Sequence, residues 1–459
     1  MPEQFDLIVI GGGSAARDGA NKAARDYGAR VALVERTRWG GSCPNIACKP
    51  TKAYLVVADL LHDVNTLAER LGIEVGPARA NLAKIKARKD SLLKSQEQWV
   101  EDLNGAGFST YDGVAELVDA QTVRANGQEL EAERILIASG SRTAVPPVDG
   151  IDDVGWIDHI SALELTELPA SLLVLGGGAV GLEFGQAFSR FGSQVTIVDA
   201  LEQIAPRAEP DAAAQLAAAL HDEGIELVTN TFVKGVRRDG DIAATLAPRD
   251  GGPEQELRVE QILLASGRVP NVEELNLAAV GVETTKLGIA VDEHMRTSAD
   301  GIWAAGDVTA VAQFTPVAQY QARIAVDDMF GTPAAADYDA LPTAIFTDPE
   351  LAQLGLTEDE ARDRGFDADS VRHELAHVQR AAYTDSRHGL YKLVFDVPSR
   401  RLLGVHVVAR GASDIVQGLA VAMKLGATVD DLARAHHAFP TLGEGVKAAA
   451  EQARARVGA

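Results

Sequence analysis

The sequence predicts an α/β chain made of two similar strand–helix–strand units and a smaller α+β unit towards the C-terminus. The first observation behind this prediction is an internal repeat, which joins residues 7–35 (LIVIGGGSAARDGANKAARDYGARVALVE) and residues 172–199 (LLVLGGGAVGLEFGQAFSRFGSQVTIVD). Each copy runs from an apolar strand through three glycines into an amphipathic helix, and then into a second apolar strand that ends in an acid. The second observation is another pair of matching strands. The third is a change after residue 342 to short alternating strands and amphipathic helices.

The glycines of both copies have the spacing of a dinucleotide-binding unit. In such a unit the first glycine permits a tight turn, the second lets a pyrophosphate approach the backbone, and a small third residue seats the helix against the sheet. The closing acids, Glu35 and Asp199, stand where a carboxylate accepts both ribose hydroxyls. The residues that fill the three small positions are Gly11, Gly13 and Ala16 in the first copy and Gly176, Gly178 and Gly181 in the second.

The second pair of matching strands is RILIASGS (134–141) and QILLASGR (261–268). Each predicts a buried strand ending in a glycine-bearing turn, either an ordinary strand end or a chain passing beneath a bound cofactor. GIWAAGDVT (301–309) places Asp307 after another apolar strand and ahead of a helix predicted from near Pro316. This carboxylate either helps to hold a polyol and a pyrophosphate or caps a helix.

The remaining segments complete the predicted architecture. The charged residues 78–103 predict a solvated helix between the repeats, and the acidic, proline-bearing residues 331–342 predict a linker. After the linker the pattern predicts a compact α+β unit with strands at 343–347, 389–396 and 401–409 and helices at 357–364, 412–425, 428–436 and 443–455.

Composition excludes several classes of partner. With 43 basic and 66 acidic residues, the chain has a formal charge of -23, which repels phosphate backbones and anionic lipid surfaces. We therefore expect no nucleic-acid partner, and no segment has the length needed to span a membrane. The first residues carry no basic leader and no long apolar core, so we expect a cytoplasmic protein.

The segment GGSCPNIACKPTK (40–52) contains the only two cysteines, Cys43 and Cys48. In a reducing compartment a lasting structural disulfide is not expected, which leaves metal binding, redox activity or coincidence. A closed zinc site needs four ligands, and no further cysteine exists to complete one. Redox chemistry is therefore favoured, and no metal site is predicted.

Taken together, these features resemble the flavoprotein disulfide reductases, the pyridine nucleotide-dependent family that includes dihydrolipoamide dehydrogenase, glutathione reductase and mercuric reductase. Residues 40–52 are similar to the family's redox-active segment, GGTCxNxGCxPSK. GRVPN (267–271) and AAGDV (304–308) are similar to further family signatures, and the resemblance covers essentially the whole chain.

The resemblance implies two Rossmann-like domains, which bind FAD and NAD, and a C-terminal α+β dimerisation domain of a homodimer. The implied division is FAD binding over 1–147 and 268–336, NAD(P)H binding over 148–267 and dimerisation over 337–459. The implied FAD residues are Gly11, Gly13, Ala16, Glu35, Gly41, Ser42, Lys52, Gly113, Ser139, Gly140, Asp307 and Ala318. The implied nucleotide residues are Gly176, Gly178, Val180, Gly181, Asp199, Val233 and Gly267.

The resemblance also implies an electron route from NADH through FAD to a Cys43–Cys48 disulfide and on to an acceptor. Cys48 would face the flavin, and Cys43 would exchange with substrate. We expect Cys48 to be the thiolate, because it begins the helix predicted from CKPTKAYLVVADLLHDV. Lys52, one turn later, would lie beside the flavin and pair with Glu183.

The strand-end acid Asp199 bears on the choice of nucleotide. A carboxylate at this position accepts the free 2′-hydroxyl of NADH and repels the 2′-phosphate of NADPH. The sequence therefore predicts NADH as the electron donor and NADPH as the poorer one.

One family motif is altered. Thiol-specific members carry HPTxxE, whose histidine, oriented by the glutamate, moves a proton to and from the substrate thiol. HHAFPTLGE (436–444) keeps Glu444 but has Phe439 in the histidine position. His437 either replaces the missing base or is an ordinary interface residue. The change predicts slow reaction with lipoamide or glutathione disulfide.

The altered motif favours an acceptor that needs no base, such as a thiophilic metal ion or a quinone. EGVKAAAEQ (444–452) resembles the mercuric reductase branch, but the chain ends ARARVGA without that branch's terminal cysteine pair. The leading hypothesis is an NADH oxidoreductase whose acceptor is a metal ion such as Hg(II) or a small disulfide. The alternatives are a dihydrolipoamide dehydrogenase-like reductase, a diaphorase or quinone reductase that bypasses the thiols, and a redox sensor.

Overall fold

The computed structural model describes residues 2–458. Its contacts group the chain into two compact units. Unit 1 contains residues 1–51, 87–144 and 267–336, and unit 2 contains residues 52–86, 145–266 and 337–459. The division into four functional segments remains a prediction beside this grouping. Among residues 2–458, no helix combines the length and the apolar character needed to cross a lipid bilayer.

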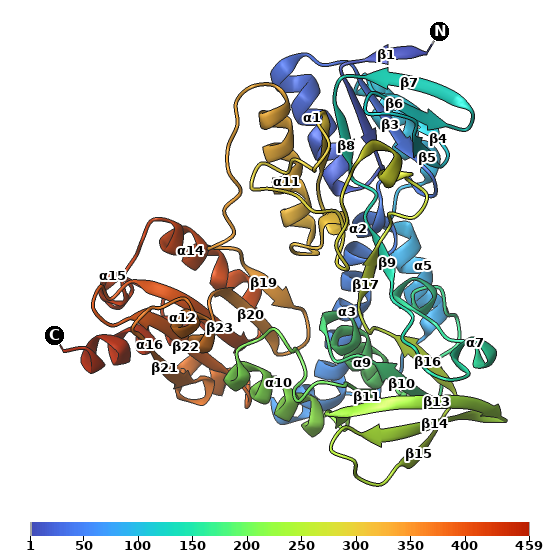
Figure 1. Ribbon diagram of the computed structural model, residues 1–459. Helices are drawn as coiled ribbons and strands as arrows, with labels where there is room; N and C mark the ends of the chain where they lie inside the picture. The colour runs from blue at the N-terminus through green and yellow to red at the C-terminus, as the bar shows by residue number, and fades with distance from the viewer. Residues whose placement is uncertain (1, 459) are drawn as a thin grey trace. The chain divides into compact units, whose positions relative to one another are not determined.

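Unit 1 is built on a five-stranded parallel sheet with the order β18-β8-β2-β3-β4. Helices α1 (Ser14–Tyr27) and α11 (Thr315–Met329) lie side by side and bury small and aliphatic side chains with this sheet (Figure 1). The predicted strand of RILIASGS lies directly beside the first strand of the repeat. The strands are β2 (Leu7–Ile10), β3 (Val31–Glu35), β4 (Ser109–Asp112), β8 (Ile135–Ile137) and β18 (Ile302–Ala304).

Smaller elements complete unit 1. A four-stranded sheet has the order β1-β7-β6-β5, and β9 pairs with β17 in an antiparallel ribbon. Their bounds are β1 (Glu3–Phe5), β5 (Ala115–Leu117), β6 (Thr122–Ala125), β7 (Gln128–Ala132), β9 (Ser141–Thr143) and β17 (Arg268–Pro270). The short helical segments are α2 (Ser42–Asn45), η2 (Leu277–Val280) and η3 (Asp307–Thr309).

The single solvated helix predicted over 78–103 is wrong in two respects. The segment forms two helices, α5 (Leu82–Ser91) and α6 (Gln96–Gly105), because Ser95 begins a new helix with a reciprocal cap. The Gln98 N–H donates to the Ser95 hydroxyl at 3.2 Å, and the Ser95 N–H donates to the Gln98 side chain at 2.9 Å. In addition, Trp99 and Leu103 of α6 are buried in the core of unit 1.

Unit 2 contains the second repeat as a parallel sheet with the order β12-β11-β10-β16. The strand of QILLASGR is β16, which lies beside β10 as β8 lies beside β2. The strands are β10 (Ser171–Leu175), β11 (Gln194–Val198), β12 (Glu226–Val228) and β16 (Gln261–Leu264), with an antiparallel sheet of β13 (Thr231–Asp239), β14 (Asp241–Pro248) and β15 (Gln255–Val259). The helices in these segments are α7 (Ile151–Val154), α8 (His159–Ala162), α9 (Ala179–Phe191) and α10 (Pro210–Asp222).

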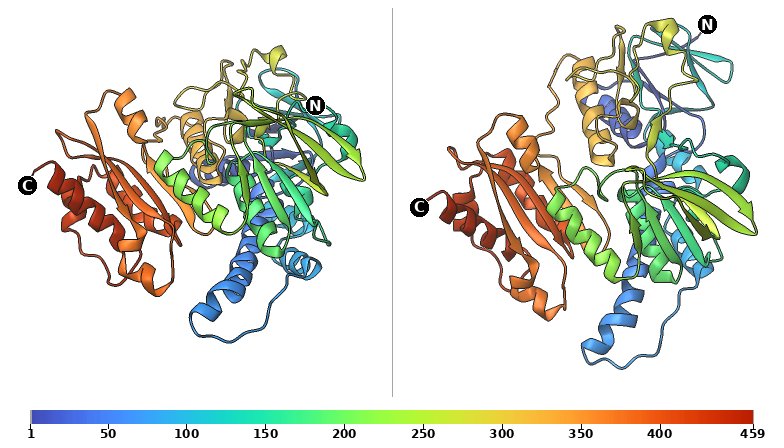
Figure 2. Two further views of the ribbon diagram at one scale, coloured as in Figure 1. Left: turned by 90° about the horizontal axis from the view of Figure 1, so that it is seen from below. Right: turned by 60° about the horizontal axis from the view of Figure 1, so that its bottom comes forward.

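The C-terminal part of unit 2 is an antiparallel sheet with the order β19-β20-β23-β22-β21. Helix α16 lies along its strands in both views of Figure 2. The predicted strands are present as β19 (Thr343–Ile345), β22 (Leu390–Asp396) and β23 (Leu402–Ala409), whereas β20 (Glu350–Gly355) and β21 (Ala368–Glu374) were not predicted. The helices are α12 (Glu358–Asp363), η4 (Leu375–His377), α13 (Gln379–Tyr383), α14 (Ala412–Lys424), α15 (Val429–Arg434) and α16 (Glu444–Arg456).

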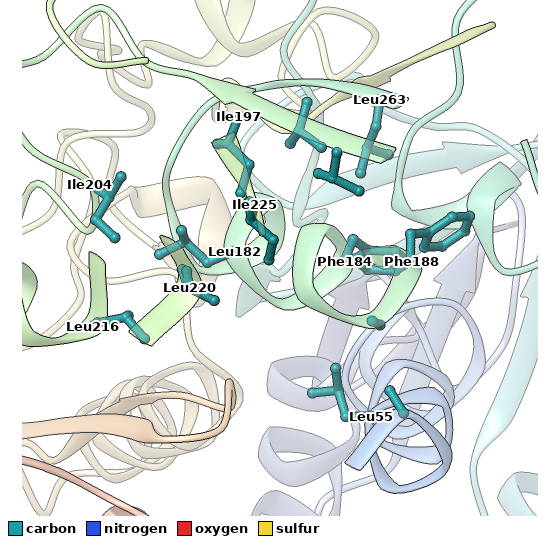
Figure 3. Packing of buried hydrophobic residues seen from close by; sticks show 14 of the residues in the cluster. Leu55, Leu182, Phe184, Phe188, Ile197, Ile204, Leu216, Leu220, Ile225 and Leu263 are labelled. Atoms are coloured by element: carbon teal, nitrogen blue, oxygen red, sulfur yellow. The ribbon is translucent and has the colours of Figure 1, made fainter. Parts of the chain in front are cut away.

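Helix α3 (Cys48–His62) joins the main core of unit 2 through its later turns, and a π-turn, η1 (Asp63–Leu67), and α4 (Ala68–Arg70) follow it. Leu55 belongs to the same buried cluster as Phe184 and Phe188 of α9 (Figure 3). The Tyr54 hydroxyl donates to the Leu163 carbonyl at 3.1 Å. These contacts fix the direction of α3 within the unit.

A buried arginine ties four segments of unit 2 together. The Arg190 side chain on α9 is only 3% exposed. Its guanidinium lies 2.6 Å from the Asp59 carboxylate on α3 and 2.7 Å from Glu223, which follows α10. It also donates to the Asp348 carbonyl at 3.2 Å. Removing the guanidinium would leave the Glu223 carboxylate, which is 14% exposed, without its cationic partner, which is costly.

We expect Arg190→Met to lower the free energy of unfolding by about 3–5 kcal/mol, because the largely buried Glu223 carboxylate loses its cationic partner. The midpoint of the urea transition, followed by circular dichroism, measures this. Arg237→Met is the matched control, since Arg237 and Glu256 form an exposed pair at 2.7 Å. The control should move the midpoint little. Equal shifts for the two variants would contradict the structural role of Arg190.

Candidate active site

The first glycine turn leaves room that a side chain would fill. Gly11 has φ of +126°, and a Cβ there would lie 2.3 Å from the Ala138 carbonyl oxygen at the end of β8. A Cβ on Gly41 would lie 2.4 Å from the Cα of Gly13. Gly13 precedes α1 without a side-chain cap, so the first N–H groups of that helix are available. The turn therefore fits the pyrophosphate of a dinucleotide.

The second glycine turn repeats this construction in unit 2. Gly176 has φ of +113°, and a Cβ there would lie 2.4 Å from the Ala265 carbonyl oxygen at the end of β16. A Cβ on Gly181 would lie 1.9 Å from the Gly176 carbonyl oxygen, whereas Gly178 has open space around it. Close packing therefore explains why residues 176 and 181 are glycines, whereas Gly178 has the space to face a ligand.

Backbone amides hold both closing acids. Glu35 accepts from the Gly12 N–H at 2.7 Å, and Asp199 accepts from the Gly177 N–H at 2.7 Å. The other oxygen of Asp199 accepts from the Leu201 N–H at 2.8 Å. Each carboxylate is therefore fixed beside its glycine turn. Asp199 keeps lone pairs for further donors, whereas the second Glu35 oxygen already accepts from Thr37 and Arg38, so that only the oxygen bonded to Gly12 has room for another donor.

Asp307 contacts the polar groups of the β9–β17 ribbon. It accepts from the Ser141 hydroxyl at 2.7 Å, and its carboxylate lies 3.6 Å from the Arg268 Nε. Helix α11 begins later, at Thr315, so Asp307 does not cap it. The neighbouring Ser139 is held by its hydroxyl, which donates to the Asn271 carbonyl at 2.7 Å.

The structure places the other predicted cofactor residues as follows. Ala16 is fully buried in α1, and Ser42 begins α2. In unit 1, Gly113, Gly140 and Gly267 have positive φ, and Ala318 is buried in α11; in unit 2, Val180 lies in the first turn of α9 and Val233 is buried in β13.

The two cysteines are free thiols, Cys43 in α2 and Cys48 as the first residue of α3. Cys48 forms a hydrogen bond with Cys43, and the Cys48 sulfur lies 3.7 Å from the Thr315 hydroxyl. Cys43 is half-buried and Cys48 is exposed. The two thiols are therefore bonded to each other, and the Thr315 hydroxyl lies beside the pair.

The pKa of Cys43 is lowered to about 6. The hydrogen bond with Cys48 is the largest cause; burial opposes it, and the Thr315 hydroxyl and the charges of Lys49 and Arg17 lower the pKa further. The predicted thiolate at Cys48 remains a prediction beside the lowered pKa of Cys43.

Sequence reasoning missed the residues that hold the cysteine loop. Asn45 donates to the Trp39 and Gly41 carbonyls at 2.8 Å each, and the Trp99 indole N–H donates to the Asn45 side chain at 3.1 Å. A Cβ on Gly40 would lie 2.6 Å from the Trp99 ring. The loop is therefore clamped by α6. Only the apolar i, i+4 spacing of Trp99 and Leu103 could have signalled this burial.

The expected pair of Lys52 and Glu183 is brought together in unit 2. The Lys52 ammonium lies 2.6 Å from Glu183 and 4.2 Å from the centre of the Phe346 ring. The second Glu183 oxygen accepts from the Phe346 N–H at 3.0 Å. Phe346 was not predicted, and it fixes the carboxylate that holds the lysine.

The structure does not bring His437 and Glu444 together as a hydrogen-bonded pair. Glu444 accepts from the Thr441 N–H at 2.9 Å at the start of α16. His437 is half-buried and makes no side-chain hydrogen bond to residues 2–458. The Phe439 side chain is 71% exposed. Within one chain, Glu444 holds the backbone of Thr441 ahead of α16, and Phe439 faces outward.

Comparisons with known proteins define the class of this molecule. The pyridine nucleotide-disulphide oxidoreductase family matches residues 5–322, and the dimerisation domain of the same family matches residues 341–450. The chain therefore belongs to this family, whose members bind FAD and a pyridine nucleotide. The predicted family and fold class are confirmed.

Relatives span essentially the whole chain. Mercuric reductase from Staphylococcus aureus is 35% identical over 97% of this chain and 82% of its own length. Dihydrolipoyl dehydrogenase from Geobacillus stearothermophilus is 34% identical over 98% of this chain and 96% of its own. A solved Cu(II) complex of the HOCl-induced flavoprotein disulfide reductase RclA from Escherichia coli has a TM-score of 0.87 and 28% identity, covering 99% of this chain and 100% of that one.

The lowered pKa gives a direct test on the reduced protein. Because the thiolate is the nucleophile, the rate of Cys43 alkylation by iodoacetamide should rise with pH to a plateau, with a midpoint near pH 6. Mass spectrometry of the Cys43 peptide measures the rate. Cys48→Ala removes the hydrogen-bond partner and should move the midpoint upward. A wild-type midpoint near the ordinary thiol value of about 8.5 would contradict the arrangement.

Proposed function

We propose that this protein is an NADH-dependent FAD oxidoreductase that passes two electrons through Cys43 and Cys48 to a thiophilic metal ion, such as Hg(II) or Cu(II). The observation that carries the proposal is the combination of an intact cysteine pair with Phe439 in place of the family's proton-carrying histidine. The likeness to mercuric reductases and to the Cu(II)-bound RclA supports the choice of a metal ion.

The two glycine turns would hold the two cofactors, FAD at the turn of Gly11 and the nicotinamide nucleotide at the turn of Gly176. Bound FAD supplies the chemistry that couples hydride donation by a nicotinamide to two-electron reduction of a disulfide. Glu35 and Asp199 would accept the ribose hydroxyls. Lys52 would present its ammonium to the flavin, and Glu183 would orient it.

The functional segments would be 1–147 and 268–336 for FAD, 148–267 for the nucleotide and 337–459 for dimerisation. The match to the family's dimerisation domain supports a homodimer. In a dimer, the exposed Phe439 and the neighbouring His437 would face the partner subunit. A reducing compartment such as the cytoplasm would keep the pair available as a dithiol.

The residues of this chain suit metal reduction better than disulfide reduction. Opening a substrate disulfide releases a thiolate that needs a proton, and phenylalanine cannot supply one. Reduction of a metal ion needs only electrons: NADH gives NAD⁺, a proton and two electrons, which convert one Hg(II) to Hg(0) or two Cu(II) to Cu(I). The low pKa of Cys43 keeps it as a thiolate for the exchange at neutral pH.

The nucleotide preference rests on Asp199. Its carboxylate repels a 2′-phosphate, so kcat/KM should be at least about tenfold higher for NADH than for NADPH. Asp199→Asn should narrow this ratio, whereas Glu202→Gln, which removes an exposed neighbouring carboxylate, should preserve it. A wild-type preference for NADPH would contradict the assignment.

The acceptor is tested by NADH oxidation with Hg(II), Cu(II), lipoamide, glutathione disulfide and quinones. We expect metal-dependent turnover in the wild type, and a loss of about a hundredfold or more in Cys43→Ser, because the nucleophile is removed. Phe439→His should raise lipoamide turnover about 10²-fold or more by restoring a base, while Phe439→Leu should not.

Other outcomes of the same screen point to other functions. Fast lipoamide reduction by the wild type would identify a disulfide reductase and overturn the metal proposal. Quinone turnover that survives Cys43→Ser would identify a diaphorase that bypasses the thiols. Flavin reduction by NADH without turnover on any acceptor would favour a redox sensor.

A further inference from the structure

Arg17 lies in the first turn of α1, and its guanidinium packs against the clamp of the cysteine loop. The guanidinium carbon lies 4.6 Å from the centre of the Trp99 ring. Trp99 in turn bonds Asn45, two residues beyond Cys43. A cation held on an aromatic face keeps a fixed position without a carboxylate partner.

The neighbouring Asp18 attracts the charge of Arg17 without forming an ion pair with it. Among residues 2–458, no carboxylate forms an ion pair with it, and its Nε is buried without a hydrogen-bond acceptor. The adjacent Asp18 is engaged by Arg323, whose guanidinium donates to it at 3.0 Å. Arginine stays protonated in proteins, so a positive charge is fixed in this part of unit 1.

This charge reaches the outer thiol. Burial lowers the pKa of Arg17, and attraction to Cys43 opposes this; the Arg17 charge in turn adds to the lowering of the Cys43 pKa, of which the hydrogen bond with Cys48 is the largest cause. The exposed Lys49 acts on Cys43 in the same direction. Two cations, the half-buried Arg17 and the exposed Lys49, therefore act on Cys43 in a chain whose formal charge is -23.

We propose that Arg17, assisted by Lys49, makes the reaction at Cys43 selective for anionic partners. A thiophilic metal ion would then be accepted from an anionic complex, such as one with chloride or thiolate ligands, in preference to the free cation. Arg17 is a positioning residue in this scheme, because it acts on the acceptor's approach through its field. The inference rests on the proposed function only in taking Cys43 as the outward thiol.

The selectivity is measured on the reduced holoenzyme by alkylating Cys43 with iodoacetate, which is anionic, and with iodoacetamide, which is neutral. In both reactions the Cys43 thiolate attacks carbon, a thioether forms and iodide leaves. The ratio of the two rate constants at one pH cancels the thiolate fraction and reports the local potential. Mass spectrometry of the Cys43 peptide follows each reaction.

We expect the wild-type ratio to exceed that of an unstructured cysteine peptide in the same buffer. Arg17→Met should lower the ratio at least about threefold. Arg17→Lys should retain most of it, which also guards against a purely structural loss. Lys94→Met is the matched control, since the Lys94 ammonium lies 4.9 Å from the centre of the same Trp99 ring. This control should leave the ratio unchanged.

An unchanged ratio in Arg17→Met, or a wild-type ratio at or below that of the free peptide, would overturn the inference. Equal losses in Arg17→Met and Arg17→Lys would overturn it as well, because the effect would then follow shape and not charge. None of these readings requires turnover with an acceptor, so the inference and the proposed function fail separately.

Discussion

The hydrogen bond between the thiols of Cys48 and Cys43 is the interaction on which the chemistry of this molecule depends. It requires that two short elements, α2 and the start of α3, present their sulfurs to each other at a fixed separation. The bond to Thr315 and the clamp of Asn45 by Trp99 maintain this arrangement from other parts of unit 1. The same hydrogen bond is the largest cause of the lowered pKa of Cys43.

The rest of the structure repeats one solution twice. In both units a glycine turn meets the carbonyl that follows a neighbouring parallel strand, at Ala138 and at Ala265. The closing acid of each unit is held by a backbone N–H, that of Gly12 or that of Gly177. The two ASG segments of the sequence, residues 138–140 and 265–267, therefore pack against the glycine turns. Two glycine turns of the same construction suit a member of a family that binds two dinucleotides, FAD and a pyridine nucleotide.

The sequence predicts this repeated design well because its signals are local. Strand, glycine turn, helix and closing acid all lie within about thirty residues in each copy, and the apolar period of each element is unbroken. The buried side of α6, the stacking of Arg17 on Trp99 and the contact of Phe346 with Lys52 could not be predicted in the same way. Each of them joins residues far apart in the sequence, and none leaves a local pattern.

Strands β20 and β21, which were not predicted, show within one sheet that a strand without a clear local pattern is missed. β21 has a single buried residue, Val371, so its alternation is too weak to be recognised. The placement of the thiolate at Cys48 likewise followed from a local feature, the start of a helix. The hydrogen bond with Cys48 is the largest cause of the lowered pKa of Cys43, and Thr315, which comes from a distant helix, lowers it further.

The central claim is that electrons from NADH reach the cysteine pair. One equivalent of NADH, added without oxygen to the oxidised FAD-loaded protein, should expose two new thiols per chain. Differential alkylation should locate both on the peptide that contains Cys43 and Cys48. Flavin that is bleached by NADH while this peptide keeps its disulfide would contradict the account.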